Sequence, residues 1–195
     1  MRVIAGSAKG ISLSSLNGDR TRPILEKIKG SLFNILANVV PESRVLDMFA
    51  GTGSIGIEAL SRGAKSCIFV ECNKSAIQII KKNLEATGFR DKSQVLECDV
   101  FKIIPYLESN KSEIDIAFAG PPYPLIDESP TRDNLLKLFS NLCDKQIILP
   151  DGIMVLQHRK GNVVIPPAAC CIELFDSRLY GVTQLSFFKV VGDIY

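Results

Sequence analysis

From residue 44 onward, short apolar runs alternate with longer segments in which apolar residues recur at helical spacing. The runs predict strands at 44–49, 66–71, 93–98, 115–119 and 152–158, and helices are expected from Ser54 and Ser75 and near Phe101 and Asn134. Strands that are separated by helices are joined by right-handed crossovers. We therefore expect an α/β fold with a mostly parallel sheet and helices on both of its faces.

The two ends of the chain depart from this alternation. The last apolar runs, 170–177 and 183–190, are separated by five residues, too few for a crossover, so these strands should pair antiparallel. Near the start, 2–16 resembles a hairpin of two short strands around a glycine turn, and apolar spacing from Ile24 to Val39 predicts an amphipathic helix. We expect residues 1–40 to form an extension and 41–195 to form one domain.

Composition narrows the class of protein. With 195 residues, 46% of them apolar, the chain should form a packed globule, and its six cysteines show no C-x-x-C spacing that would indicate a metal site. No apolar run approaches the roughly 20 residues of a membrane span, and the N-terminus lacks the apolar region of a secretory signal. A cytoplasmic protein without membrane contact is expected.

Basic residues are concentrated at the N-terminus. The net charge of +2 does not by itself indicate nucleic-acid binding, but the first 29 residues contain six basic side chains against two acidic ones. The basic ones are candidate RNA contacts: Arg2, Lys9, Arg20, Arg22, Lys27 and Lys29.

A glycine-rich segment follows the first predicted strand of the domain. Gly51, Gly53 and Gly56 open the next helix and match the dinucleotide fingerprint, and Glu71, twenty residues after Gly51, could accept hydrogen bonds from ribose hydroxyls. This pattern alone leaves a nicotinamide-dependent oxidoreductase open. Asp47, however, would repel a pyrophosphate, whereas it could pair with a cationic amine or orient the loop. It therefore favours S-adenosylmethionine, which carries an amine and a sulfonium but no phosphate.

A second motif ends the strand at 115–119. Gly120, Pro121, Pro122 and Tyr123 resemble the [Asp/Asn]-Pro-Pro-[Tyr/Phe] motif of methyltransferases that modify exocyclic amino groups, although two prolines can also simply end a strand. Acceptors aimed at both N–H bonds of such an amine favour the pyramidal form that attacks a methyl group, and the aromatic ring can stack on the base. Because Gly120 replaces the Asp or Asn, one acceptor is missing, at a cost of about 3–4 kcal/mol in the transition state.

Seven segments together resemble the RsmD family, which methylates guanine N2 in bacterial small-subunit (16S) ribosomal RNA. They are RVIAG, TRP, SLFNIL, VLDMFAGTGSIGIEALSRGA, FVE, PPY and YGVTQLSFF. The resemblance implies a Rossmann-like class I methyltransferase fold with seven strands, an antiparallel last pair and an N-terminal hairpin that helps to hold RNA. It also implies S-adenosylmethionine as cofactor, with S-adenosylhomocysteine as product. The implied partner is 16S rRNA or the assembling small ribosomal subunit, and the implied state is a monomer.

The motifs and the resemblance assign the site residues. The cofactor residues are Asp47, Phe49, Ala50, Gly51, Thr52, Gly53, Glu71, Asp99 and Val100, where Asp99 could hold the adenine amine, cap the following helix, or do both. The catalytic residues are Gly120, Pro121, Pro122 and Tyr123.

Three functions are consistent with these residues. They are an rRNA (guanine-N2)-methyltransferase, a weakly active or inactive RNA-binding relative because of Gly120, and a nicotinamide-dependent oxidoreductase, which Asp47 and the Pro-Pro-Tyr segment disfavour. The single histidine, His158, has no evident triad partner and is expected to be structural or an RNA contact rather than catalytic.

Overall fold

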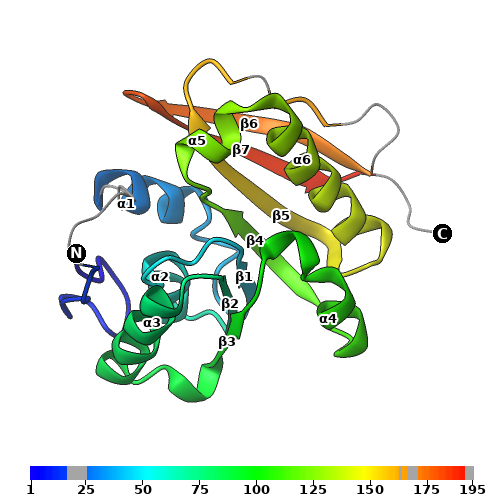
Figure 1. Cartoon of the computed structure of the whole chain (residues 1–195). Coiled ribbons are helices and arrows are strands. Elements are labelled where there is room, and N and C mark those ends of the chain that lie inside the picture. Colours follow the sequence, from blue (N-terminus) through cyan, green and yellow to red (C-terminus); the bar gives the residue numbers. More distant parts are fainter. Residues whose placement is uncertain (17–25, 163, 167–170, 192–195) are drawn as a thin grey trace. The chain divides into compact units, whose positions relative to one another are not determined.

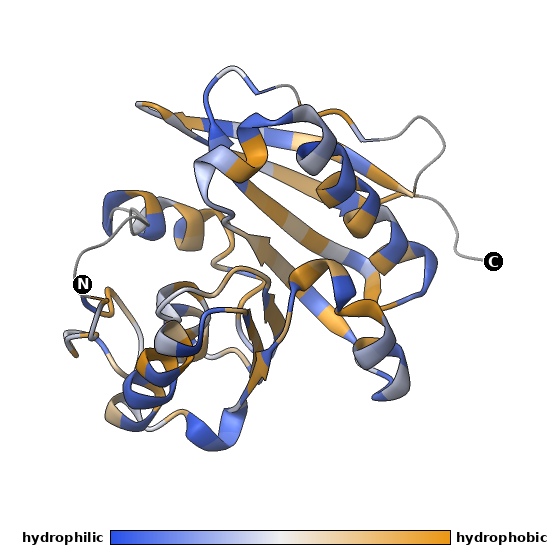
Figure 2. Cartoon of the chain, in the orientation of Figure 1, coloured by the Kyte–Doolittle hydropathy of each residue, from blue (hydrophilic) through white to orange (hydrophobic). Residues whose placement is uncertain are grey.

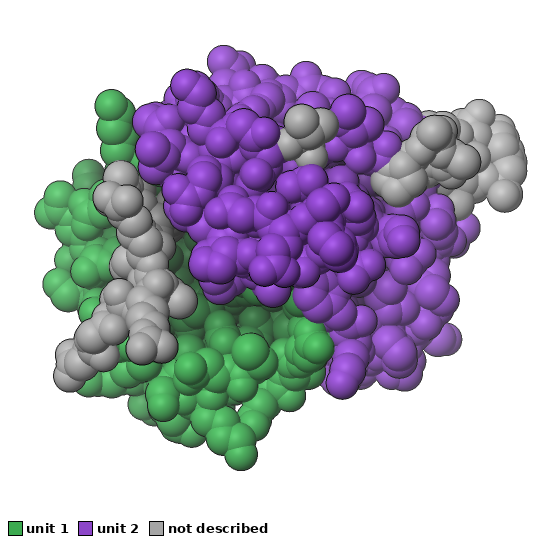
Figure 3. Space-filling model, turned by 45° about the horizontal axis from the view of Figure 1, so that its top comes forward, with its two compact units in different colours: residues 1–100 green, residues 101–195 purple. Residues whose placement is uncertain are grey.

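The computed structural model of the chain describes residues 1–16, 26–162, 164–166 and 171–191 (Figure 1). Within these ranges apolar residues line β4 (Ile114–Ala119) and β5 (Ile148–Arg159), while apolar and polar residues alternate around α3 (Lys74–Thr87) (Figure 2). The chain forms two compact units, residues 1–100 and 101–195 (Figure 3).

Unit 1 contains a three-stranded parallel sheet and its helices. Its elements are α1 (Glu26–Ile35), β1 (Arg44–Asp47), α2 (Ser54–Ser61), β2 (Ser66–Glu71), α3 (Lys74–Thr87), the 3-10 turn η1 (Arg90–Lys92) and β3 (Ser93–Glu97). The strand order is β3-β2-β1, with α2 packed on β1 and β2 and α3 packed on β2 and β3. Because the strands are parallel, Asp47 at the end of β1 and Glu71 at the end of β2 share the carboxyl edge of the sheet.

Unit 2 contains both parallel and antiparallel pairs. After η2 (Val100–Lys102), which begins with the last residue of unit 1, its elements are α4 (Ile104–Ser109), β4 (Ile114–Ala119), α5 (Tyr123–Asp127), α6 (Ser129–Asp144), β5 (Ile148–Arg159), β6 (Ile172–Tyr180) and β7 (Thr183–Val190). β4 runs parallel to β5, which pairs antiparallel with β7, and β7 pairs antiparallel with β6. The expected antiparallel C-terminal pair is confirmed.

The helices have local signals at their ends. The side chain of Asn73 accepts hydrogen bonds from the backbone N–H groups of Ser75 and Ala76 at 2.9 and 3.1 Å, which caps α3, and Gly88 ends that helix in the left-handed conformation. In α6 the apolar face is buried, and the ring of Phe139 meets that of Phe188 edge-on at 5.8 Å between centroids.

The expected N-terminal hairpin is confirmed in a short form, because residues 1–3 and 11–13 run antiparallel through one bridge, Arg2↔Ser12, and two backbone hydrogen bonds of 3.0 and 2.8 Å. The intervening amides have other acceptors: those of Ile4 and Ala5 donate to the carboxylate of Glu58 on α2 at 2.8 and 3.0 Å. Because these two amides bond to a neighbouring helix, they do not extend the antiparallel pairing, so the hairpin is short and is docked on α2.

The helical segments show two further differences from expectation. α1 spans ten residues and gives way to turns before Pro41, so it is shorter than the predicted helix, whose first two residues lie outside the described ranges. The helix α5 was not predicted, and it begins within the Pro-Pro-Tyr segment. No described helix has the length and apolar character needed to cross a membrane. The division at residue 40 remains an expectation.

Candidate cofactor loop and acceptor motif

The loop between β1 and α2 takes a conformation that suits glycine. Gly51 and Gly53 have φ values of 55° and 82°, in the left-handed region that other residues rarely adopt. Apart from its chain neighbours, no described residue has an atom within 4 Å of the place where a Cβ on Gly51 would sit, so the backbone there is open to a close ligand. The loop is tied to the sheet by the amide of Ala50, which donates to the Val70 carbonyl at 3.0 Å.

The third glycine of the fingerprint has a packing role. A Cβ on Gly56 would overlap the ring of Phe69 and the sulfur of Cys67, both on β2. Gly56 therefore lets α2 approach the strand closely, which is one of the roles that glycine takes in this fingerprint.

Asp47 lies beneath the loop and is 1% exposed. Its Oδ2 accepts a hydrogen bond from the Gly56 amide at 3.0 Å, while Oδ1 is buried and has no hydrogen-bond partner among the described residues. Burial raises the pKa of Asp47 to about 7, against the lowering effect of the Gly56 hydrogen bond. The carboxylate thus orients the start of α2 and retains one oxygen able to accept from a bound amine.

Glu71 closes the other side of the loop. Its Oε2 accepts from the Gly51 amide at 2.8 Å, and its Oε1 accepts from the amides of Cys72 and Asn73 at 2.9 and 2.8 Å. The carboxylate therefore holds the glycine loop at the end of β2, and its contact with a ribose stays a prediction.

The remaining predicted cofactor residues lie in the loop or just after β3. Phe49 and Thr52 are half-buried, Ala50 and Val100 are buried, and Asp99 is exposed between β3 and η2. A residue that was not predicted supports this loop: the buried Asn83 on α3 donates to the Thr52 carbonyl at 2.9 Å and also bonds to the backbone of Ser14. The only sequence signal for Asn83 is an amide on the apolar face of a helix.

The acceptor motif lies in unit 2, after β4. Pro121 is buried, Pro122 is exposed, and Tyr123 begins α5. The hydroxyl of Tyr123 lies 2.5 Å from that of Thr183 at the start of β7, and the guanidinium carbon of Arg159 lies 4.9 Å from the centre of the Tyr123 ring. The ring is therefore fixed by two residues that were not predicted as site residues.

Gly120 is not required by the backbone, because its φ lies outside the left-handed region. A Cβ on Gly120 would lie 2.9 Å from Cε1 of Phe118, a side chain on β4 that is 4% exposed. The ring of Phe118 therefore crowds the position from which an Asp or Asn side chain would start.

Comparison with known proteins places the chain in a family. A family model described as Conserved hypothetical protein 95 matches residues 1–189. YlbH of Bacillus subtilis, named as a candidate rRNA methyltransferase, is 35% identical over 98% of this chain and 100% of its own length. Ribosomal RNA small subunit methyltransferase D of Haemophilus influenzae is 32% identical over 86% of this chain and 83% of its own length. The chain belongs to the RsmD family.

The fold of this RsmD-family protein is similar to a solved structure from Escherichia coli, that of yhhF, which is named as a candidate methyltransferase. The two structures match over 99% of each chain with a TM-score of 0.80, at 24% sequence identity. The described residues form seven strands, mostly parallel, with an antiparallel C-terminal pair, which is the class I methyltransferase fold that the sequence predicted.

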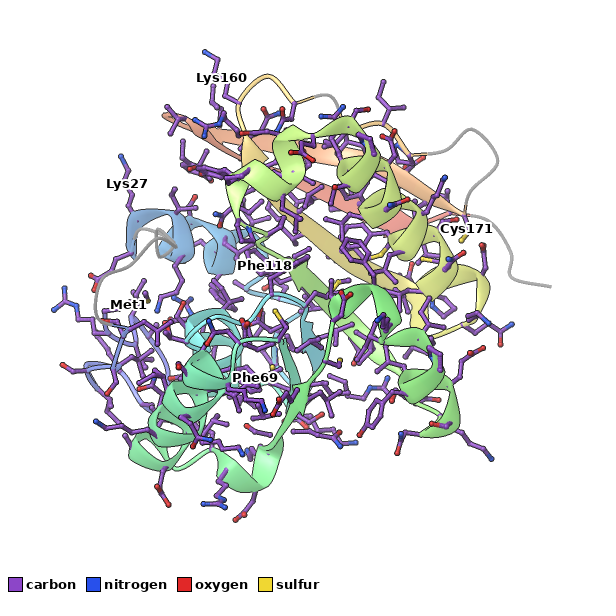
Figure 4. All side chains as sticks on the ribbon, viewed as in Figure 1. Met1, Lys27, Phe69, Phe118, Lys160 and Cys171 are labelled. Atoms are coloured by element: carbon purple, nitrogen blue, oxygen red, sulfur yellow. The ribbon has the colours of Figure 1, made fainter. Side chains whose placement is uncertain are left out.

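The basic residues of this RsmD-family protein divide into exposed and buried ones. Lys9 and Lys27 are exposed, and Lys27 points away from the ribbon (Figure 4). Arg2 is also exposed and pairs with Glu26 at 3.3 Å, while the predicted contacts Arg20 and Arg22 lie outside the described residues.

The prediction that Lys29 contacts RNA is wrong. Its side chain is 0% exposed, and its Nζ lies 3.1 Å from Oε2 of Glu58 and donates to the Arg2 carbonyl at 2.9 Å. Burial lowers the pKa of Lys29 despite the neighbouring Glu58. Helical periodicity could have indicated this burial, because Lys29, like its neighbour Ile28, lies on the face of α1 that the apolar residues bury.

Glu58 is the centre of a buried network that the sequence did not reveal. Besides Lys29 and the two N-terminal amides, it receives the Arg62 guanidinium, whose Nε donates to Oε1 at 2.8 Å. The Arg62 guanidinium also lies 5.1 Å from the centre of the Phe33 ring on α1. This network fixes the N-terminal loop and α1 on α2.

His158 is structural. It is fully buried on β5, with its Nδ1 2.9 Å from the Arg159 carbonyl and its Nε2 2.8 Å from the Ser186 hydroxyl. A carbonyl can only accept, so Nδ1 carries the proton and Nε2 accepts from Ser186. Burial lowers the pKa of His158 and keeps the ring neutral, and the burial also rules out an RNA contact.

Proposed function

We propose that this protein transfers the methyl group of S-adenosylmethionine to the exocyclic N2 of a guanine in bacterial 16S rRNA. The observation that carries the proposal is the buried Oδ1 of Asp47, which has no hydrogen-bond partner in the described part of the chain and lies beneath a left-handed glycine loop, in a chain of the RsmD family. Relatives named as small-subunit rRNA methyltransferases support the substrate class.

The residues of unit 1 fit this cofactor. The open backbone at Gly51 can lie against it, Oδ1 of Asp47 can accept from its amine, and the carboxylate of Glu71 can accept from its ribose hydroxyls. In this proposal Asp99 binds the adenine amine. When bound, S-adenosylmethionine supplies an electrophilic methyl group on a sulfonium. A nicotinamide dinucleotide fits less well, because its pyrophosphate would face the Asp47 carboxylate.

The residues of unit 2 serve the methyl acceptor. The Pro121 carbonyl accepts one N–H of the guanine amine, which favours the pyramidal form, and the Tyr123 ring stacks on the base. The N–CH3 bond forms as the S–CH3 bond of the sulfonium breaks, and the methylated amine, now cationic and acidic, releases its extra proton to water. No general base is required, and His158 has both nitrogens engaged within the fold. Since Gly120 lacks a side-chain acceptor, turnover should be lower by about 10²–10³ than with an acceptor there.

The exposed basic residues of the N-terminal segment bind the RNA backbone in this proposal. Arg2, Lys9 and Lys27 serve with Arg20 and Arg22, because phosphate contacts position a substrate while the base is read in its pocket. The substrate is free 16S rRNA or the assembling small subunit, and the protein acts in the cytoplasm as a monomer.

The proposal is tested in two steps. Calorimetry should show binding of S-adenosylmethionine and none of NAD, and the Asp47→Asn variant should bind S-adenosylmethionine more weakly. Labelled methyl transfer is then measured on unmodified 16S rRNA and on small subunits, followed by digestion to nucleosides. N2-methylguanosine is the expected product, and a methyl group on another atom contradicts the proposal. Binding of both ligands without transfer would identify an RNA-binding relative instead.

A further inference from the structure

The end of β5 presents a basic side chain to the acceptor motif. The Arg159 guanidinium covers one face of the Tyr123 ring at 4.9 Å, and its Nε donates to Oδ2 of Asp127 at 3.1 Å. The Arg159 side chain remains 49% exposed despite these contacts. It is therefore held in place while a large part of it faces solvent.

The partners of Arg159 are themselves fixed. The other oxygen of Asp127, Oδ1, accepts from the side-chain amide of Asn162 at 2.9 Å. These hydrogen bonds lower the pKa of Asp127, so the carboxylate stays ionised beside the guanidinium. At the far end of the ring, the Tyr123 hydroxyl is bonded to Thr183. A planar cation and an aromatic ring are thus stacked and immobilised together.

Further positive charge lies at this end of unit 2. The charge of Arg132 acts on both Asp127 and His158, and Lys160, next to Arg159, points away from the ribbon (Figure 4). Residues 127–133 also contain three acids, Asp127, Glu128 and Asp133, and the Asp133 carboxylate accepts from the Ser129 hydroxyl at 3.3 Å. Since Asp127 is engaged with Arg159 and Asn162, it anchors the cation and does not leave a free carboxylate in front of it.

We propose that Arg159 binds the phosphate of the nucleotide whose base stacks on the face of Tyr123 opposite the guanidinium. This inference rests on the proposed function, because it requires an extruded guanosine at Tyr123. Extrusion of a base from its stack is unfavourable, so stacking and a phosphate contact must together compensate for it. A guanidinium suits this task because it is planar, stacks on aromatic rings and binds phosphate through two N–H groups at once.

The test compares Arg159→Gln and Arg159→Lys with a matched control, Arg178→Gln. Arg178 is 57% exposed on β6, which β7 separates from β5, and its Nε donates to Asp176 at 2.9 Å, so it is an arginine of similar exposure that is also paired with an aspartate. RNA affinity is measured over a salt series, and KM and kcat are measured by labelled methyl transfer. Melting temperature and affinity for S-adenosylmethionine are recorded for every variant.

Arg159→Gln should weaken RNA binding by about 10- to 100-fold. It should also reduce the slope of log affinity against log salt by about one, the effect of one lost phosphate contact. Arg159→Lys should keep that slope, because the charge remains, but should raise KM because a lysine ammonium neither stacks in a plane nor binds phosphate bidentately. Arg178→Gln should match the parent in every measurement.

An Arg159→Gln variant with the salt slope and RNA affinity of the parent would overturn the inference, even if its melting temperature fell. If that variant does not fold, an unchanged KM in Arg159→Lys would overturn it. Failure of the proposed function gives a different result, because RNA binding is measured without turnover. It would appear as a parent protein that binds RNA but forms no N2-methylguanosine.

Discussion

Replacing Asp47 with asparagine should stabilise the ligand-free protein at pH 8 while weakening its binding of S-adenosylmethionine. The native carboxylate is buried, with one oxygen bonded to the Gly56 amide and the other without a partner among the described residues. The asparagine side chain of the variant can still accept from Gly56, but it carries no charge. The change therefore removes the cost of burying an ion and also removes the ion that would pair with a cationic amine.

The magnitude follows from the pKa of Asp47, which burial raises from 3.8 to about 7. The folded state holds this proton more tightly than the unfolded state, so the free energy of unfolding falls as pH rises from about 4 to about 7. At roughly 1.4 kcal/mol for each tenfold change in acidity, the ionised group costs about 4 kcal/mol at pH 8 and less than half of that at pH 5. The side-chain oxygen of the asparagine keeps the hydrogen bond from Gly56, but its NH2 group has no acceptor, and burying this group costs about 1–3 kcal/mol at either pH. The variant should therefore gain about 1–3 kcal/mol at pH 8.

The assay follows thermal unfolding by circular dichroism, since the chain contains no tryptophan. The diagnostic quantity is the advantage of Asp47→Asn over the parent in free energy of unfolding, which should shrink by about 2–3 kcal/mol between pH 8 and pH 5, or about 5–10 °C in Tm. Asp91→Asn, which changes an exposed acid of unit 1, should follow the pH dependence of the parent. A difference between Asp47→Asn and parent that stays constant across this range would refute the assignment of a raised pKa to Asp47.

Two further predictions concern the basic residues of α1 and the acceptor motif. Lys29→Met should lower Tm by about 6–12 °C, because loss of one partner of a buried ion pair costs about 3 kcal/mol, and it should leave the salt dependence of RNA binding unchanged. Lys27→Met should leave Tm unchanged and reduce the salt dependence of RNA binding, and the same effect of both variants would contradict the distinction between a buried and an exposed lysine. Gly120→Asp should raise turnover mainly when it is combined with Phe118→Leu, because the smaller leucine makes room for the new aspartate side chain. If the double variant is no faster than Gly120→Asp alone, with unchanged affinity for S-adenosylmethionine, then Phe118 does not limit methyl transfer.

The elements of the fold could be predicted because their signals are local. Apolar runs of strand length separated by helical periodicity indicate parallel pairs, and the short link before Thr183 indicates an antiparallel one. The same reasoning brings Asp47 and Glu71 to one edge of the sheet, since parallel strands end on the same side. The glycine loop could be found in this way because its conformation demands glycine at particular positions.

The rest depends on contacts between distant segments, which spacing does not reveal. Glu58 receives two amides from the N-terminal loop more than fifty positions away, and nothing in its own neighbourhood distinguishes it from a surface glutamate. The same holds for Asn83 and Arg159, whose partners lie 31 and 36 positions away. Clustering of basic residues in the sequence likewise could not show that Lys29 neutralises Glu58 inside the protein.

At Gly120 the sequence and the structure each explain a part of the acceptor motif. The sequence shows that an acceptor is missing from the motif, and the structure shows that Phe118, two residues earlier, crowds the place where that acceptor would begin. Alternate residues of an extended chain point to the same side, so a large side chain at one position and none at the next equivalent position form a compensating pair. At the end of β4 the ring of Phe118 therefore occupies the space that an acceptor side chain at position 120 would need. For this reason a change at Gly120 alone is not expected to restore the motif.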